Sequence, residues 1–337
     1  MSFDISLVEE YWHLLCHRSE VAASGNFIRF ETVIGDIVVF NDGASVVAFD
    51  NLCPHRGARI YTETEGRRPA TCGYHGWTFR AGRMFVASSE RFARCEPGDL
   101  SPRLYQVEWV GDFLFVAIRP RISLSDQIAG LEMKLQAISA NIVKRRDFNH
   151  YTYDCYWPIA VENALEPYHI DKIHSETLAL LRLEDGHNVY IGLNSIWSAA
   201  IGDRTTDRRL RSFGRLFSLE EAFSGYEFIY LFPFSMISST YGYSYSIQNF
   251  FPGHDLSTRF YSRLFTSRTQ NEKAELIFDS FFESTAAINR KVFEEDHDVC
   301  KLLPAASWTM DPLRFAADSE GKIQHFRSVC RDHVKSS

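Results

Sequence analysis

The stretch from Cys53 to His75 constrains this 337-residue chain more than any other part of its sequence. It contains two Cys–His pairs, Cys53 with His55 and Cys72 with His75. One residue lies inside the first pair, two lie inside the second, and sixteen separate His55 from Cys72. Each pair can form a tight loop that offers one thiolate and one imidazole. The sequence therefore predicts a metal site made by two loops.

Two kinds of metal site fit this donor set. Two Cys and two His could hold a zinc ion, or a [2Fe–2S] cluster in which two His replace two Cys on one iron. The spacing alone does not separate the two interpretations, although zinc fingers usually keep the two Cys together and the two His together. The flanking residues favour the cluster. Pro-His-Arg-Gly follows Cys53 and Gly-Tyr-His-Gly-Trp follows Cys72, and both runs resemble a Rieske iron–sulfur domain.

Composition argues against several classes of function. The net charge is −7 and the sequence has no basic run, so nucleic-acid binding has no electrostatic support. No apolar run approaches the ~20 residues of a membrane span, and the first residues lack the basic and apolar regions of a signal peptide. Apolar residues make up 45% of the chain, which is ordinary for a globular protein. We expect neither a nucleic acid nor a membrane as partner.

The remaining cysteines indicate the redox environment. If Cys53 and Cys72 bind metal, five of the seven cysteines remain: Cys16, Cys95, Cys155, Cys300 and Cys330. An odd, scattered set argues against a disulfide framework and for a reducing compartment. We therefore predict a cytoplasmic protein.

The first part of the chain is typical of a small antiparallel β domain. Residues 5–21 predict a short helix or turn followed by a docking segment. Alternating apolar residues then predict short strands, separated by turn residues and interrupted by the two Cys–His loops. These strands are Phe27–Phe30, Ile37–Phe40, Val46–Phe49, Trp77–Arg80, Leu104–Trp109 and Phe113–Ile118. Pro120 closes the series, so we expect domains at residues 1–119 and 120–337.

The second part predicts helices around a sheet. Residues 123–143 have apolar side chains at three- and four-residue steps, which predicts a helix, with Ser123 as a plausible N-cap. A strand is expected at 151–156, and a helix with Pro158 in its first turn follows it. Residues 226–266 predict a broad antiparallel sheet, and residues 272–303 have the longest helical pattern.

A second group of metal-binding residues lies in the segment from Glu162 to His174. Glu166 and His169 are three residues apart and would share a helix face. His169 and His174 are five apart, about 140° around a regular helix, so they meet at one metal only if the helix is distorted or ends between them. Pro167 favours such an irregularity. Two exposed histidines on an ordinary helix remain the alternative.

Two His and one carboxylate form the facial site of non-haem Fe(II) oxygenases, and the late helix offers the carboxylate. Its residues 294–296 are Glu294-Glu295-Asp296. On a helical wheel, Asp296 lies about 40° from Val292 of the apolar stripe, Glu295 lies about 60° away on the other side, and Glu294 points outward. The wheel favours Asp296 over Glu295 by a small margin.

Together, the two groups resemble the oxygenase α subunit of the Rieske non-haem iron oxygenases, in the expected order over nearly the whole chain. The resemblance implies that the cluster ligands are Cys53, His55, Cys72 and His75. It implies His169, His174 and Asp296 as ligands of a mononuclear Fe(II), because the Glu295-Asp296 pair resembles the family's late acidic motif. Glu166 matches the catalytic acidic residue that links the two centres, and it would contact a cluster His of a neighbouring subunit.

Two features depart from the common pattern of that family. Most members have Asp where this chain has Glu166. Glu resembles the branch that acts on quaternary ammonium compounds such as carnitine and glycine betaine. The chain length, however, is nearer to the demethylating monooxygenases of the vanillate and dicamba kind.

The resemblance also implies a fold, a reaction and partners. The fold would be α+β, with a small all-β Rieske domain and a catalytic domain whose large antiparallel sheet is flanked by helices. The chain would hydroxylate or demethylate a small organic substrate with O2. Electrons would come from NAD(P)H through a separate reductase, sometimes with a ferredoxin, because the chain has no Gly-X-Gly-X-X-Gly motif. Family members form rings, often trimers, so a homotrimer is expected.

Three alternatives remain open at this stage. The first is an aromatic-ring cis-dihydroxylating dioxygenase, and the second is a Rieske electron-transfer protein without oxygenase activity. The third is a binding module stapled by zinc. The Tyr-rich runs at 226–230 and 241–245 could line a substrate pocket or belong to the core.

Overall fold

A computed structural model describes residues 2–86, 88–92, 100–309 and 320–336. The chain forms two compact units, one of residues 4–122 and the other of residues 1–3 and 123–337. All six cysteines within the described residues are free, and Cys95 lies outside them. None of the helices in the described part of the chain is long and apolar enough to cross a membrane.

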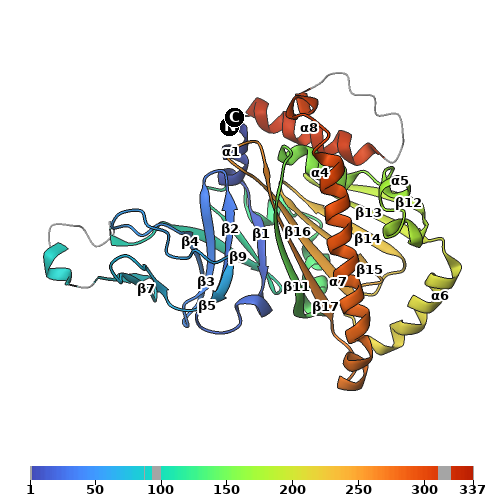
Figure 1. Ribbon diagram of the computed structural model, residues 1–337, viewed down its shortest axis with the longest axis horizontal. Helices are drawn as coiled ribbons and strands as arrows, with labels where there is room; N and C mark the ends of the chain where they lie inside the picture. Colours follow the sequence, from blue (N-terminus) through green and yellow to red (C-terminus); the bar gives the residue numbers. More distant parts are fainter. Residues whose placement is uncertain (1, 87, 93–99, 310–319, 337) are drawn as a thin grey trace. The chain divides into compact units, whose positions relative to one another are not determined.

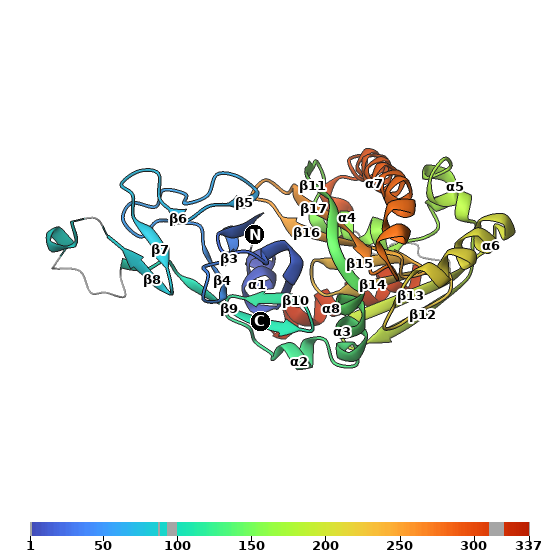
Figure 2. The ribbon, with the colours of Figure 1, turned by 90° about the horizontal axis from the view of Figure 1, so that it is seen from below.

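The unit of residues 4–122 consists mainly of β-structure. Seven antiparallel strands form a sheet in the order β1-β10-β9-β4-β3-β2-β5. They are β1 (His13–His17), β2 (Asn26–Thr32), β3 (Gly35–Asn41), β4 (Val46–Asp50), β5 (Glu65–Arg67), β9 (Leu104–Val110) and β10 (Phe113–Ala117). A three-stranded sheet stands apart from the seven-stranded one (Figure 2) and contains β6 (Ala70–Thr71), β7 (Thr78–Arg80) and β8 (Arg83–Phe85). The helices in this part of the chain are α1 (Ser2–Glu10), η1 (Arg18–Val21) and η2 (Ser89–Phe92).

The sequence predicted most of these strands but not β1. The six strands expected between residues 27 and 118 are confirmed as β2, β3, β4, β7, β9 and β10. Residues 13–17 were expected to dock without strand structure, yet β1 pairs with β10. All five residues of β1 are buried, so the strand has none of the polar–apolar alternation by which half-buried strands are identified.

The unit that contains residues 123–337 has a seven-stranded antiparallel sheet in the order β11-β17-β16-β15-β14-β13-β12. The strands are β11 (Ile142–Tyr153), β12 (Leu183–Ile191), β13 (Asn194–Ile201), β14 (Tyr226–Leu231), β15 (Ser235–Thr240), β16 (Ser244–Pro252) and β17 (Thr258–Ser267). The α-helices are α2 (Leu124–Gln127), α3 (Glu132–Asn141), α4 (Trp157–Leu165), α5 (Ile170–Ile173), α6 (Arg204–Phe213), α7 (Glu272–Cys300) and α8 (Gly321–Ser336). The 3-10 helices are η4 (Leu178–Leu181), η5 (Gly214–Leu216) and η6 (Ala305–Thr309). The predicted α+β class is confirmed.

The start of the helical segment was predicted correctly, but its continuity was not. The Ser123 hydroxyl accepts a hydrogen bond from the Asp126 N–H, so Ser123 is the N-cap that the sequence predicted. The single helix expected over 123–143 is wrong, because α2 and α3 are separate. Gly130 lies between them with a φ of +81°, a backbone conformation that glycine adopts easily and that a continuous right-handed helix does not contain.

One face of this sheet carries the helices that matter for the site. Figure 1 shows α7 crossing in front of the strands, and contacts of α4 and α7 with β16 and β11 place both helices on the sheet. The ring of Phe293 on α7 packs on Phe260 at 5.0 Å, and Phe326 on α8 packs on Tyr230 at 5.7 Å. In the ladder between β13 and β14, Trp197 lies directly opposite Phe228, so their side chains are on the same face of the sheet. We call this side of the sheet the helix-covered face.

Candidate metal centres

The two Cys–His loops have matching backbones. The Gly57 N–H donates to the Cys53 carbonyl at 2.8 Å, and the Gly76 N–H donates to the Cys72 carbonyl at 3.0 Å. The two glycines have φ values of +70° and +72°. This left-handed conformation is disfavoured for residues with a Cβ, by about 1–2 kcal/mol. A glycine four residues after each cysteine therefore lets each loop turn back tightly.

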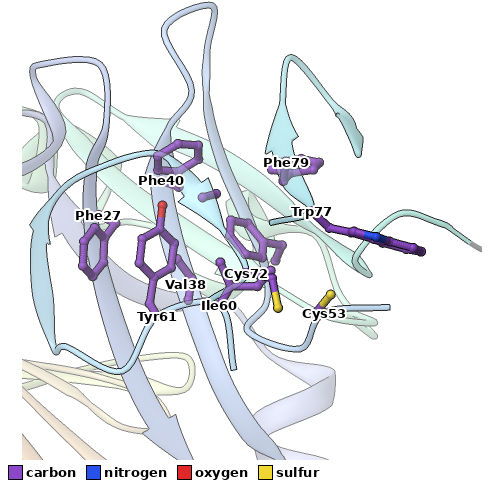
Figure 3. Packing of buried hydrophobic residues seen from close by; sticks show 11 residues of the cluster. Phe27, Val38, Phe40, Cys53, Ile60, Tyr61, Cys72, Trp77 and Phe79 are labelled. Carbon is purple, nitrogen blue, oxygen red and sulfur yellow. The ribbon is translucent and has the colours of Figure 1, made fainter. Parts of the chain in front are cut away.

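The loop side chains form two pairs. Cys53 and Cys72 are buried in an apolar cluster with residues such as Tyr61 and Phe79, and Figure 3 shows both sulfurs at its edge. Burial raises the pKa of the Cys53 thiol, and a hydrogen bond with the Cys72 thiol raises it further. The Nδ1 atoms of the two loop histidines lie 3.1 Å apart. The thiol pair is thus in the core and the imidazole pair is nearer the surface.

Aromatic rings hold the imidazoles in place. The His55 ring stacks on Trp77 with 4.8 Å between centroids, and it also contacts the rings of His75 at 4.6 Å and Phe92 at 5.6 Å. The His75 ring lies 3.9 Å from the ring of Tyr74, which is 57% exposed. His75 itself remains exposed. The loop therefore positions an imidazole rigidly at the surface of its unit.

The second group of residues lies where α4 ends. Leu165 is the last residue of α4, and Glu166 has an extended backbone with φ −96° and ψ 116°. The ring of a proline clashes with the residue before it and disfavours a helical backbone there. Pro167 therefore accounts for the end of α4. The prediction that the helix breaks near Pro167 is confirmed. The expectation that Glu166 and His169 share one helix face is wrong, because the break lies between them.

Three side chains converge beyond this break. The Nε2 atoms of His169 and His174 are 3.2 Å apart. Oδ1 of Asp296, on α7, lies 3.1 Å from Nε2 of His174 and 3.5 Å from Nε2 of His169. Within the described residues, only these three Cys, His, Asp or Glu side chains form a group with ligand atoms all within 4.8 Å of one another. We call this group the triad.

A second layer of polar groups orients the triad. Oε2 of Glu166 lies 3.0 Å from Nδ1 of His169, and Oε2 of Glu295 lies 2.8 Å from Nδ1 of His174. Each imidazole therefore has a carboxylate on Nδ1 and can present Nε2 to the shared point. Glu295, the other candidate for the third ligand, contacts the far nitrogen of His174, whereas Asp296 joins the triad.

Two residues of this layer were missed by the sequence analysis. The Asn163 amide donates to Oδ1 of Asp296 at 2.7 Å, and the Thr177 hydroxyl donates to Oε2 of Glu295 at 3.0 Å. Asn163 lies three residues before Glu166 and is only partly exposed on a largely buried helix. A polar residue at that position was a usable signal. Thr177 gave no signal, because its partner is 118 residues away.

The triad is a set of strongly coupled charges. Burial would lower the pKa of His169, but hydrogen bonds with Asp296 and Glu166 outweigh burial and raise it to about 9. Burial would raise the pKa of Asp296, but hydrogen bonds with the two histidines lower it to about 2. The site therefore combines a stable carboxylate with two imidazoles whose pKa values are raised. Two imidazoles and one carboxylate suit Fe(II) and leave coordination positions for other ligands.

A cavity of about 870 Å³ reaches the triad. Its lining includes residues 167–173 and, from the sheet, Gly186, Asn188 and Trp197. Of the two Tyr-rich runs, residues 241–245 belong to the core, because Tyr241 and Tyr243 pack in an apolar cluster. In the other run, Phe228 is paired with Trp197, so it is on the helix-covered face.

Two family models match the chain. The Rieske [2Fe-2S] domain matches residues 11–91, and the catalytic domain of the ring hydroxylating alpha subunit matches residues 143–336. The chain belongs to the Rieske non-haem iron oxygenases, as an α subunit. The second model alone covers more than half of the sequence, and it contains the whole triad.

Curated relatives are similar over about half of the chain. The glycine betaine monooxygenase oxygenase subunit of Chromohalobacter salexigens is 30% identical over 186 residues, which is 53% of this chain and 41% of that protein. The carnitine monooxygenase oxygenase subunit of Escherichia coli K12 is 29% identical over 171 residues, 48% of this chain and 46% of that protein. The 2-halobenzoate 1,2-dioxygenase large subunit of Burkholderia cepacia is 26% identical over 193 residues, 53% of this chain and 42% of that protein. The matched parts thus span less than half of these relatives.

Solved structures share the fold over a longer range. The quaternary ammonium Rieske monooxygenase CntA aligns with a TM-score of 0.77 at 17% identity, over 98% of this chain and 91% of that chain. Naphthalene 1,2-dioxygenase aligns with a TM-score of 0.70 at 14% identity, over 89% and 76%. At these identities the likeness concerns the fold alone.

Proposed function

We propose that the chain is the terminal oxygenase component of a Rieske oxygenase system. Cys53, His55, Cys72 and His75 would hold the [2Fe–2S] cluster in a domain of residues 1–119. His169, His174 and Asp296 would hold the mononuclear Fe(II) in a catalytic domain of residues 120–337. The observation that carries the proposal is the convergence of the triad in a chain that also has both Cys–His loops.

The donor pairs support a cluster more than a single zinc ion. A tetrahedral zinc site draws four ligand atoms to one point at 2.0–2.3 Å, whereas this chain presents a buried thiol pair and a separate imidazole pair. A cluster with two Cys on one iron and two His on the other needs that division. The triad is not needed by an electron carrier or by a zinc-stapled module, and it argues against both alternatives.

The protein's own groups prepare the Fe(II) site. When bound, the mononuclear Fe(II) would activate O2 with electrons from the cluster. Glu166 accepts the Nδ1 proton of His169 and Glu295 accepts that of His174, which fixes both tautomers. Asn163 holds Oδ1 of Asp296. The backbone N–H of Tyr168 donates a hydrogen bond to the carboxylate of Glu166 and fixes its orientation.

The proposed partners follow from this role. The substrates would be O2 and a small organic molecule that is hydroxylated or demethylated, with ring dihydroxylation as the alternative. The relatives act on glycine betaine, carnitine or 2-halobenzoate according to their names. NAD(P)H would be used through a separate reductase, with a ferredoxin in some arrangements. A homotrimer and a cytoplasmic location stay predictions.

Oxygen consumption tests the proposal directly. The cluster- and iron-loaded protein is mixed with a compatible reductase and NADH, and O2 uptake is measured across aromatic acids, methyl ethers and ammonium compounds. We expect substrate-dependent uptake in the wild-type protein and none in His169→Ala, which removes one of only three Fe(II) ligands. A reducible cluster without substrate-dependent uptake by any compound would instead support the electron-transfer protein. Product analysis then separates insertion of one oxygen atom from insertion of two.

A further inference from the structure

A buried lysine lies on the helix-covered face of the sheet, outside the groups described above. Lys322, in the first turn of α8, is 2% exposed. Its ammonium lies 4.6 Å from the ring centroid of Trp197 and 5.1 Å from that of Phe228. Within the described part of the chain, no carboxylate lies within the 4.0 Å of an ion pair. Among the described residues, this cation contacts the rings of Trp197 and Phe228.

Such a charge is unfavourable unless something pairs with it. Burying an ammonium without a counter-charge costs several kcal/mol, and proteins usually respond by shifting the pKa. Burial lowers the pKa of Lys322 to about 7, although the charge of Glu166 acts in the opposite direction. Glu166 is therefore too weak a partner to compensate for the burial. The site is electrostatically incomplete for a cation.

Two further polar groups, one on Asn188 and one on Trp197, have no hydrogen-bond partner among the described residues. Oδ1 of Asn188 is buried without a hydrogen bond, and the indole N–H of Trp197 makes none with the residues that the structure describes. Asn188 and Trp197 are direct partners in the β12–β13 ladder, and both line the 870 Å³ cavity together with His169. We call Asn188, Trp197 and Lys322 the polar recess. Buried polar groups in proteins are nearly always hydrogen-bonded, so the unsatisfied amide oxygen of Asn188, together with a lysine that has no ion pair among the described residues, indicates a ligand.

The polar recess is close to the triad. The ring of Tyr226 meets that of Trp197 edge-on at 5.9 Å, and the charge of Asp296 acts on the Tyr226 hydroxyl. Gly186 leaves room for the indole, because a Cβ there would lie 2.7 Å from its Nε1. A small molecule that reaches both His169 and the polar recess would therefore have its reactive part near the triad and its other end near Lys322.

We propose that the substrate of this oxygenase carries a carboxylate, which pairs with Lys322 and accepts a hydrogen bond from the indole N–H of Trp197. This inference rests on the proposed function and names the substrate class. A cation without a carboxylate, such as choline, would meet the ammonium of Lys322 and be disfavoured. Benzoates and betaines share the carboxylate, and the test separates them.

Paired probes test the inference by binding, without turnover. Calorimetric titration of the cluster- and iron-loaded protein compares benzoate with benzamide, and glycine betaine with choline. We expect at least one carboxylate to bind about tenfold or more tightly than its partner, as for a charge-assisted hydrogen bond. Lys322→Met should remove that preference, and Lys322→Arg should restore most of it. The pair that shows the preference tells whether the acid is aromatic or a betaine.

A surface lysine of the same unit provides the control. Lys273, on α7, is exposed, so Lys273→Met should leave the preference unchanged. The inference is overturned if no carboxylate binds wild-type protein better than its uncharged or cationic counterpart, complete lack of binding included. It is also overturned if Lys322→Met keeps the preference. Cluster absorbance and iron content, measured on the same samples, report separately on the proposed function.

Discussion

The two candidate metal sites differ in how their possible ligands are brought together. The Cys–His loops lie in one short stretch, and each is closed by its own backbone hydrogen bonds and a glycine. The triad joins His169 and His174, beside α5, to Asp296 on α7, and its donors are largely enclosed. Short-range spacing therefore specifies the first site, whereas the second depends on the packing of a helix that comes much later in the chain.

The same comparison separates the chemical settings of the two sites. His75 is exposed at the tip of its loop, whereas His174 is 1% exposed and has carboxylates against both ring nitrogens. An imidazole at the surface suits exchange of electrons with another protein. Imidazoles that are buried and paired with carboxylates suit a divalent ion. The following predictions test how independent the two regions are.

The largest effect is expected from Cys72→Ser. This change removes a thiolate from a cluster that has only four protein ligands, so the red-brown absorbance and the acid-labile sulfide should be lost. Cys16→Ser is the control, because Cys16 is also buried in this unit but lies in β1, away from the loops. An unchanged visible spectrum in Cys72→Ser would remove Cys72 from the ligand set.

Asp296→Ala should empty the second region alone. Iron analysis should show a loss of about one iron per subunit, with the cluster spectrum intact, because a facial site has three protein ligands. Glu295→Ala should weaken iron binding by about 10–100-fold, as for a group that only orients a ligand. Glu294→Ala is the control, because Glu294 is exposed. If Glu295→Ala lost the iron and Asp296→Ala kept it, the assignment of the third ligand would be wrong.

Glu166→Gln tests whether the two regions communicate. The amide keeps the shape but loses the charge that holds Nδ1 of His169, so cluster and most of the iron should remain. Reoxidation of the reduced cluster by O2 with substrate bound should slow at least about tenfold, comparable to the effect of losing other groups that orient a metal ligand. Stopped-flow absorbance measures this rate. Wild-type kinetics would place Glu166 outside the electron path.

The smallest effect is a pH dependence confined to the triad. In the metal-free protein the pKa of His169 is about 9, above its ordinary value near 6.5. The contribution of protonated His169 to the free energy of unfolding is therefore fully present below about pH 6.5 and is lost as the pH rises through 9. Asp296, with a pKa of about 2, stays charged throughout. Calorimetric melting should show the free energy of unfolding falling over this window.

Metal binding should follow the opposite trend over that range. Fe(II) needs neutral imidazoles, so binding releases the proton of His169 and the affinity should rise roughly tenfold per pH unit below 9. Anaerobic Fe(II) titrations from pH 6.5 to 9 measure this slope. A flat profile would show that His169 is not protonated in the metal-free site.

The sequence predicted each site as far as local information reached. Cys53, His55, Cys72 and His75 could be named from spacing, because their loops are short. Pro167 predicted the end of α4, because its effect acts on the preceding residue. The wheel placed Asp296 only slightly ahead of Glu295, because helical periodicity says which side a residue faces but not what lies opposite it.

Other features had no local signal. β1 is buried along its whole length, so it lacked the alternation that identifies a strand. Thr177 and Glu295 meet only through the packing of α7 beside α5. The sequence analysis made no prediction for Lys322, because its burial against Trp197 depends on how α8 lies on the sheet.

By itself, the sequence determined which donor types this protein has, the two loops that present four of them, and the point at which α4 must end, because each depends on residues within a few positions of one another. Only the tertiary structure decided that Asp296 and not Glu295 reaches both histidines, that each histidine has its own carboxylate, and that a lysine lies beside Trp197 without an ion pair among the described residues. These arrangements join elements far apart in the chain. They depend on how helices pack on a sheet, which is set by the shape and burial of many side chains together.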